Sequence, residues 1–217
     1  MRTLHTNPGG PRAGMTLLEM TIAGALALLL ASSAILAANG GYGAFRATQS
    51  ATDVETRLRR AVDRVAGELM SSGVEELQPD PAGDFGTETL LFRRAVGLNG
   101  TQIVWGAQDR LALEASPDDA DDGIDNNADG RVDECELVWT RDVGGSDRRS
   151  VLCRGVREFL EGETLNAQDD NGNGVKDERG FSVHRLGDVL YVRLTLEEPG
   201  ETGLILRTLE TAVRLRN

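Results

Sequence analysis

Near its start the chain has a long apolar stretch, residues 15–38, in which Glu19 is the single charged residue. As an α-helix this stretch would be about 36 Å long, which exceeds the roughly 30 Å of a membrane's hydrocarbon core. A carboxylate at the bilayer centre costs roughly 2.5 kcal/mol or more, so Glu19 is expected to have a partner. The pattern predicts one transmembrane helix over these residues.

The following stretch, residues 39–73, changes from an apolar to an amphipathic pattern. Gly40, Gly41 and Gly43 each cost about 1 kcal/mol relative to alanine in a helix, which predicts a kink or a melted turn. Beyond them apolar side chains return at helical spacing, so we expect an amphipathic continuation that docks one stripe on a globular region. Gly73 is the predicted stop signal. The stripe consists of Phe45, Val54, Leu58, Ala61, Val62, Val65 and Leu69.

Residues 74–217 contain short runs rich in β-branched and aromatic residues, separated by polar turns. The clearest pair, Val189–Leu196 and Leu204–Leu215, is joined by a segment containing Pro and Gly and predicts a hairpin. A long N-terminal helix followed by such strands predicts the α+β class, with the helix packed on an antiparallel sheet. The other predicted strands are Thr89–Val96, Thr101–Trp105, Arg110–Glu114, Glu136–Thr140 and Ser150–Arg154.

A specific motif opens the apolar stretch and consists of Gly14, Met15, Thr16, Leu17, Leu18 and Glu19. It resembles the class III signal of type IV pilins and pseudopilins. The resemblance implies a pilin-like fold, cleavage after Gly14 by a prepilin peptidase, methylation of the new amino terminus at Met15, and assembly with other pilins through the helix that carries Glu19. Two positions depart from the family pattern, because Met15 replaces the usual aromatic residue and Ala13 separates Arg12 from the glycine.

Two other interpretations of this stretch stay open. An ordinary secretory signal has an apolar run of about 7 to 15 residues with a cleavage site after it, whereas this run is longer and contains Glu19. A plain membrane anchor explains the length but neither Glu19 nor the position of Gly14. Residues 57–69 and 211–217 are similar to PilW-type minor pilins and J-type secretion pseudopilins, but these short patterns do not separate the two systems.

The chain is acidic, with a net charge of −12, and removal of a leader over residues 1–14, which holds two arginines and no acids, changes the charge to −14. Nucleic-acid binding needs a basic face, so no nucleic-acid partner is expected. The leader arginines place the N-terminus in the cytoplasm and residues 74–217 in the periplasm. There Cys135 and Cys153 are expected to form a disulfide, with two buried free thiols as the alternative.

An acidic segment within residues 118–136 fits the calcium-loop pattern D-x-[DN]-x-[DN]-G-x5-E at every position. Carboxylate, amide and main-chain oxygens are the ligands that calcium prefers, and the glycine permits the sharp turn. The alternative is a solvated, disordered loop, which is how acidic runs usually behave. The predicted calcium ligands are Asp125, Asn127, Asp129, the main-chain carbonyl of Arg131, Asp133 and Glu136.

A second segment, within residues 166–180, repeats this spacing 44 residues later. The match is less complete because Gly180 stands at position twelve, where Glu178 is a less certain substitute. Neither loop has obvious flanking helices, so both resemble calcium loops of extracellular proteins, and the Ca²⁺ is expected to be structural. The weaker ligand set is Asp169, Asn171, Asn173, Val175 and Asp177.

Catalysis finds little support in the sequence. His5 lies in the leader, and His184 stands in a strand-like run where a structural role is expected. No catalytic triad, zinc spacing or phosphate loop is visible in the sequence. We expect a structural subunit, a minor pilin or pseudopilin at the tip or in the priming complex of a type IV pilus or type II secretion filament. The alternative is a membrane-anchored, extracytoplasmic calcium-binding adhesin or sensor that does not polymerise.

Overall fold

The computed structural model describes residues 14–200 and 203–215. The chain divides into two compact units, residues 1–46 and 47–217. Apart from Gly14, the predicted leader lies outside the described residues.

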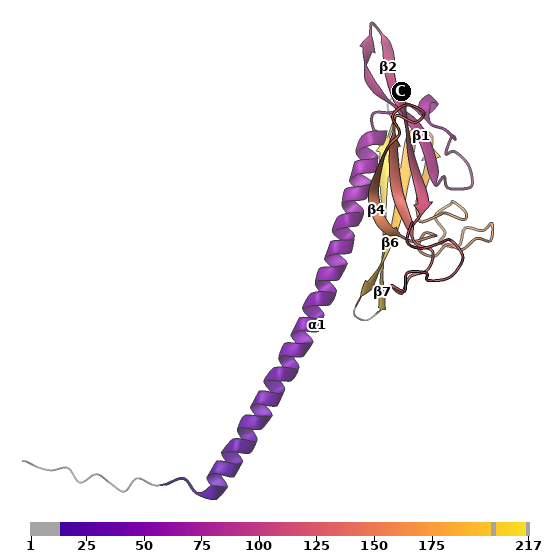
Figure 1. Cartoon of the computed structure of the whole chain (residues 1–217). Coiled ribbons are helices and arrows are strands. Elements are labelled where there is room, and N and C mark those ends of the chain that lie inside the picture. The colour runs from indigo at the N-terminus through magenta and orange to yellow at the C-terminus, as the bar shows by residue number, and fades with distance from the viewer. Residues whose placement is uncertain (1–13, 201–202, 216–217) are drawn as a thin grey trace, which may run out of the picture. The chain divides into compact units, whose positions relative to one another are not determined.

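One helix, α1 (Leu17–Leu69), contributes residues to both units (Figure 1). In the first unit its apolar side chains are exposed, as illustrated by Leu28 at 71% and Leu36 at 72%. This part of the helix is long and apolar enough to cross a membrane. The helix continues through residues 39–43, so the predicted melted turn is absent. Glycine lowers helix propensity there but introduces no steric clash.

The amphipathic pattern is confirmed for the part of α1 that belongs to the second unit. Phe45 lies before that unit and is 67% exposed, so it does not extend the buried stripe. The helix ends at Leu69, four residues before the predicted stop at Gly73. The buried residues are Val54, Leu58, Ala61, Val62, Val65 and Leu69.

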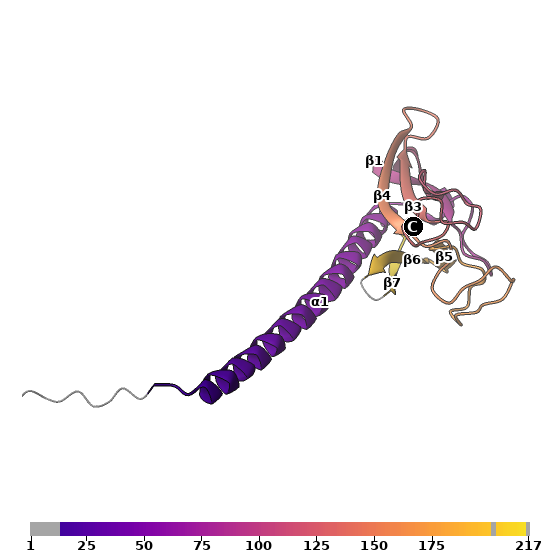
Figure 2. The ribbon, with the colours of Figure 1, turned by 60° about the horizontal axis from the view of Figure 1, so that its bottom comes forward.

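A seven-stranded antiparallel sheet makes up most of the second unit, in the order β1-β2-β3-β4-β6-β5 with β7 also paired to β6 (Figures 1 and 2). β4 meets β6 only at Val156 opposite Leu196. The predicted α+β layout is therefore present. The elements after α1 are the 3-10 helix η1 (Val74–Glu76) and the strands β1 (Thr89–Asn99), β2 (Gln102–Ala115), β3 (Cys135–Arg141), β4 (Arg148–Val156), β5 (Phe181–Leu186), β6 (Val189–Gly200) and β7 (Gly203–Arg214).

Several strands are longer than their local sequence predicted. β2 is one continuous strand where two were expected, because nearly all of it pairs with β1 or β3. Residues 197–200 were predicted to be a connecting loop, but they extend β6 and pair with β7. β5 is the strand-like run that was expected around His184, although no bounds were predicted for it. Cross-strand pairing, rather than local residue preference, sets these boundaries.

The core lies between the buried stripe of α1 and the sheet. Trp139 on β3 is among its largest fully buried side chains. Three guanidinium groups approach the Trp139 ring, those of Arg64 at 5.1 Å, Arg94 at 5.6 Å and Arg141 at 3.9 Å from the centroid. The side chains of Arg64 and Arg94 are 52% and 37% exposed, and an exposed contact of this kind is worth about 0.5–1 kcal/mol. Arg64 comes from α1 and Arg94 from β1, so this cluster ties the helix to two strands.

Candidate functional sites at the start of the helix and in two acidic loops

Glu19 is the third residue of α1, and Thr16 lies at the N-cap position directly before the helix. The Thr16 main-chain N–H donates to Glu19 Oε2 at 2.8 Å, and the Thr16 hydroxyl lies 3.0 Å from the same oxygen. In return the Glu19 N–H donates to Thr16 Oγ1 at 3.3 Å. This reciprocal pair is a capping box, which satisfies two main-chain donors at the helix start. Gly14 and Met15 precede it and are exposed.

The two acidic segments are loops at one end of the sheet (Figure 1). The first loop, residues 116–134, joins β2 to β3, and the second loop, residues 157–180, joins β4 to β5. Because neighbouring strands run antiparallel, β2 and β4 both finish at the end where these loops begin. The turn between β1 and β2 lies at the opposite end.

The first half of the first loop winds as the calcium-loop pattern predicts. Asp125 accepts main-chain hydrogen bonds from Asp129 at 3.2 Å and from Gly130 at 2.9 Å. Asn127 Oδ1 also accepts from the Asp129 N–H at 2.9 Å, and Asp129 Oδ1 accepts from the Arg131 N–H at 3.1 Å. Gly130 has a φ of 90°, the left-handed conformation for which the pattern requires glycine. Positions one, three and five are therefore gathered in one turn.

The predicted ligands at positions nine and twelve point elsewhere. Asp133 closes the base of the loop, because its Oδ1 accepts the N–H groups of Asp122 and Gly123, both at 3.0 Å. Glu136 lies in β3, where its buried carboxylate pairs with Arg154 at 3.1 Å and Arg149 at 3.4 Å. The structure therefore does not bring the six predicted ligands together.

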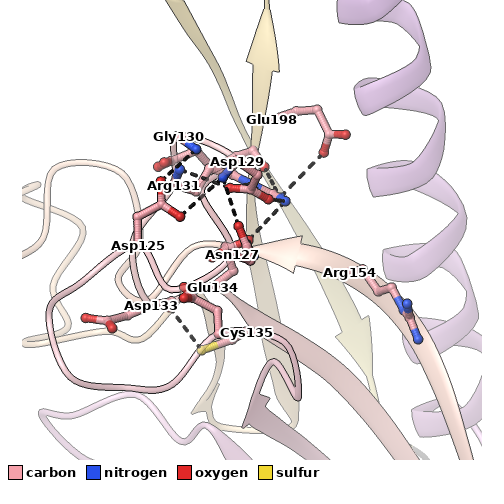
Figure 3. Close-up of polar contacts among 12 residues, drawn as sticks. Asp125, Asn127, Asp129, Gly130, Arg131, Asp133, Glu134, Cys135, Arg154 and Glu198 are labelled. Atoms are coloured by element: carbon pink, nitrogen blue, oxygen red, sulfur yellow. Dashed lines mark hydrogen bonds and ion pairs between the residues drawn. The ribbon is translucent and has the colours of Figure 1, made fainter.

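The Arg131 side chain lies among the acids of the first loop (Figure 3). Its Nη2 contacts the carboxylate of Asp129 and lies 3.0 Å from Glu134 Oε1. Its Nη1 lies 3.8 Å from Glu198 on β6 and donates to the Glu197 carbonyl at 3.2 Å. The sequence pattern used only the main-chain carbonyl of Arg131, so this role of the guanidinium was missed.

Two buried acids of the first loop, Asp119 and Glu134, were also missed; they are 1% and 5% exposed. Asp119 accepts the N–H of Asn126 at 2.7 Å and that of Glu134 at 3.4 Å. Burial raises the pKa of Glu134 to about 7, and its hydrogen bond with Asp119 acts in the same direction. That hydrogen bond lowers the pKa of Asp119. The sequence feature that could have indicated a role for Glu134 is the Asp-Glu pair at positions nine and ten, which both loops share.

The second loop repeats the turn of the first. Asp169 accepts from the N–H groups of Asn173 at 3.0 Å and Gly174 at 2.8 Å, and Asn171 Oδ1 accepts from that of Asn173 at 3.0 Å. Asp177 closes the base by accepting from two main-chain N–H groups, as Asp133 does. Left-handed φ values recur at four equivalent pairs, Gly123 and Ala167, Ala128 and Gly172, Gly130 and Gly174, and Asp133 and Asp177.

Glu178 fastens the second loop to the sheet. It is fully buried, its Oε1 accepts from Ser182 Oγ at 2.8 Å, and it pairs with Arg193 on β6 at 2.7 Å. Its Oε2 receives a hydrogen bond from the Asn173 amide. Val175, the predicted main-chain ligand, has a buried side chain. The position-ten acid of this loop therefore has a structural partner in the sheet.

A group of three or more His, Cys, Asp or Glu side chains placed to hold a metal ion does not occur among residues 14–200 and 203–215. The repeated turns are thus ordered by their own hydrogen bonds. Calcium binding by either loop stays a prediction.

The predicted disulfide is contradicted, because Cys135 and Cys153 are both buried free thiols. The strand register explains this, since Cys135 lies opposite Val156 and Cys153 lies opposite Leu137. The two cysteines are therefore diagonal neighbours, which are typically about 7–8 Å apart between α-carbons, beyond the usual range for a disulfide.

Both thiols are expected to resist modification in the folded protein. Burial raises the pKa of Cys135 to about 12 and that of Cys153 to about 11, whereas a free cysteine titrates near 8.5. Only the thiolate reacts, so alkylation at pH 8 should be about 100-fold or more slower than in unfolded protein. The measurement is mass spectrometry after iodoacetamide treatment without reductant. Both cysteines should be labelled after denaturation. If neither is labelled in the denatured protein, the two cysteines form a disulfide.

The one described histidine, His184 on β5, makes a hydrogen-bonding contact of 3.0 Å between its Nε2 and the Gly83 carbonyl. A functional assignment has to rest on the motif at the start of α1 and on the two acidic loops. Comparison of the chain with known protein families, with curated proteins and with solved structures finds no match.

Proposed function

We propose that the chain is a minor pilin or pseudopilin, anchored in the inner membrane by the first part of α1 and then built into an envelope-spanning filament. The observation that carries the proposal is the start of this helix. A glycine precedes a helix whose apolar side chains are exposed from Leu17 to Leu36 and whose one charge there is Glu19. Apolar surface of this extent needs lipid or other apolar helices around it. The helix of a pilin is surrounded first by membrane lipid and then, in the filament, by the helices of other subunits.

The capping box at Glu19 is compatible with a role in assembly. A carboxylate has about four lone-pair sites, and the hydrogen bonds from Thr16 occupy part of that capacity. The free amino group of Met15 in a neighbouring subunit is the natural cation at the same depth. Pairing the two charges would offset the cost of holding each of them in an apolar environment.

The β-rich region supports a place at one end of the filament rather than along its shaft. It carries a seven-stranded sheet and two acidic loops of 19 and 24 residues. Such a bulky region fits poorly into a tightly repeating shaft, so we assign the chain to the tip or to the priming complex.

The second candidate is a membrane-anchored adhesin or sensor of the cell envelope. The repeated acidic loops favour it, because they form an organised polar surface that needs no polymer. The two candidates differ in N-terminal processing and in the presence of the chain in filaments.

Processing after Gly14 is the direct test of the pilin assignment. Mass spectrometry of the membrane-extracted protein should find a chain that starts at Met15 and carries an added methyl group. Gly14→Val should block cleavage, because the peptidase accepts a small side chain at the cut. Gly24→Ala is the matched control, since neither glycine has neighbouring atoms within 4 Å of an added Cβ. An intact leader in the parent protein, or a cut after residue 38, would exclude the assignment.

A further inference from the structure

We propose that the second acidic loop is a calcium site, and that the guanidinium of Arg131 takes the place of calcium in the first loop. This reverses the order that the sequence pattern favours, and it does not depend on assembly into a filament. The side chains assigned to the calcium ion are Glu163, Asp169, Asn171 and Asn173.

The first loop already holds a cation. Arg131 is charged at all relevant pH values, and its side chain is 15% exposed. It contacts Asp129, the predicted calcium ligand at position five, and Glu134 at position ten (Figure 3). The carboxylate of Glu134 is thus held by the guanidinium at 3.0 Å and by its hydrogen bond with Asp119. Calcium would have to displace a buried charge to enter.

The second loop has no such cation at the equivalent place. Position seven is Val175, whose side chain is 1% exposed. Arg193 on β6 lines a pocket together with Asn171 and Asn173, but its guanidinium is engaged by Glu178 at 2.7 Å and Glu210 at 2.6 Å rather than by an assigned ligand. Within the described part of the chain, neither Glu163 nor Asp169 takes part in an ion pair. The turn that gathers positions one, three and five is nevertheless the same as in the first loop.

Glu163 gives the second, independent indication of a ligand. Its side chain is almost fully buried, with 3% of the residue exposed. Its Oε1 accepts the N–H of Asn171, which directs the carboxylate at the loop, while its Oε2 has no hydrogen-bond partner. A buried carboxylate oxygen without a partner costs about 1–3 kcal/mol or more. A cation bound beside the loop would remove that cost.

The donor set accounts for the absence of a three-acid cluster among the described residues. Two of the four assigned side chains are amides, so the site contains only two carboxylates. Asn171 and Asn173 are exposed, so the two amides of the assigned set are open to solvent. Oxygen donors alone select a hard cation, and calcium tolerates irregular geometry better than magnesium, which demands a tight octahedron.

Calcium binding to the full chain in detergent, measured by equilibrium dialysis with Ca²⁺ alone, tests the proposal. The parent should bind one ion, with a dissociation constant of about 10⁻⁴ to 10⁻³ M as in other extracellular sites. Glu163→Gln should weaken binding at least tenfold, and magnesium should compete poorly. Glu134→Gln, the same change at a buried acid of the first loop, should leave binding unchanged. Arg131→Met should raise the stoichiometry from one to two.

Circular dichroism of each variant separates a lost site from a lost fold. If Glu163→Gln does not fold, Asp169→Asn takes its place, because it keeps the side-chain size and removes one ligand charge. A parent that binds no calcium or two ions would overturn the proposal. Loss of binding in Glu134→Gln with binding kept in Glu163→Gln would assign the site to the first loop instead. A single site in Arg131→Met would refute the role given to the guanidinium.

Discussion

Replacing Glu19 with glutamine is expected to remove the protein from filaments while leaving cleavage after Gly14 intact. Glutamine can still close the capping box, because Gln serves as well as Glu at this position. It cannot supply the negative charge that would pair with the amine of Met15 in a neighbouring subunit. A charge left without its partner in lipid costs roughly 2.5 kcal/mol or more, so incorporation should fall by about 60-fold.

Two further variants separate the charge of Glu19 from its capping role. Glu19→Ala removes both and should fail like the glutamine variant. Thr16→Ala removes the hydroxyl of the capping box but keeps the charge, so its incorporation should stay within a few-fold of the parent. The measurement is the amount of protein in sheared filaments relative to the membrane fraction. If Glu19→Gln is incorporated like the parent, the residue acts only as a helix cap.

Arg193→Met should lower the stability of the second unit by about 3–5 kcal/mol, because it leaves the buried Glu178 without its cation. Glu178 is 0% exposed and Arg193 is 7% exposed, so water cannot replace the lost partner. In a region of this size that corresponds to a fall in the unfolding midpoint of about 10 °C or more. Thermal unfolding of the full chain in detergent measures this fall in the midpoint, and a chelator removes any contribution from calcium.

The double variant Glu178→Gln with Arg193→Met removes both charges and should recover part of the loss. Arg59→Met is the control, because its ion pair with Glu55 is exposed on α1 and is worth about 0.5 kcal/mol. If Arg193→Met and Arg59→Met shift the midpoint equally, the buried pair does not hold the second loop to the sheet.

The elements that local pattern decides were predictable. The apolar stripe on α1 recurs with the helical period, and the residues from Val54 to Leu69 that it predicted are buried. The melted turn was predicted wrongly because glycine propensity was weighed alone. A helix that is already formed on both sides of Gly40 and Gly41 continues through them, since each costs only about 1 kcal/mol.

The partners of charged residues were not predictable, because they come from distant strands. Arg131 reaches Glu198 on β6, and Glu178 reaches Arg193, also on β6. No spacing in the sequence encodes these pairs. Glu136 illustrates the reverse case, since it fits the calcium pattern by spacing, yet β3 takes it into the sheet and gives it two arginines. The calcium-loop pattern correctly predicted the turn at positions one to five of both loops. It did not predict where the side chains at positions nine and twelve point.

The carboxylate that closes the base of each loop also bears on how the chain folds. Asp133 holds Asp122 and Gly123, so residues 123–133 form a small ring within the 19-residue connection 116–134. Once that ring has formed, about eight residues remain to be closed when β2 meets β3. The entropy of closing a loop grows with the logarithm of its length, so this saves about 0.8 kcal/mol at the step where the strands pair. Asp177 forms the same ring in the second loop. Long acidic insertions of this design can therefore be added between neighbouring strands with little delay to their pairing.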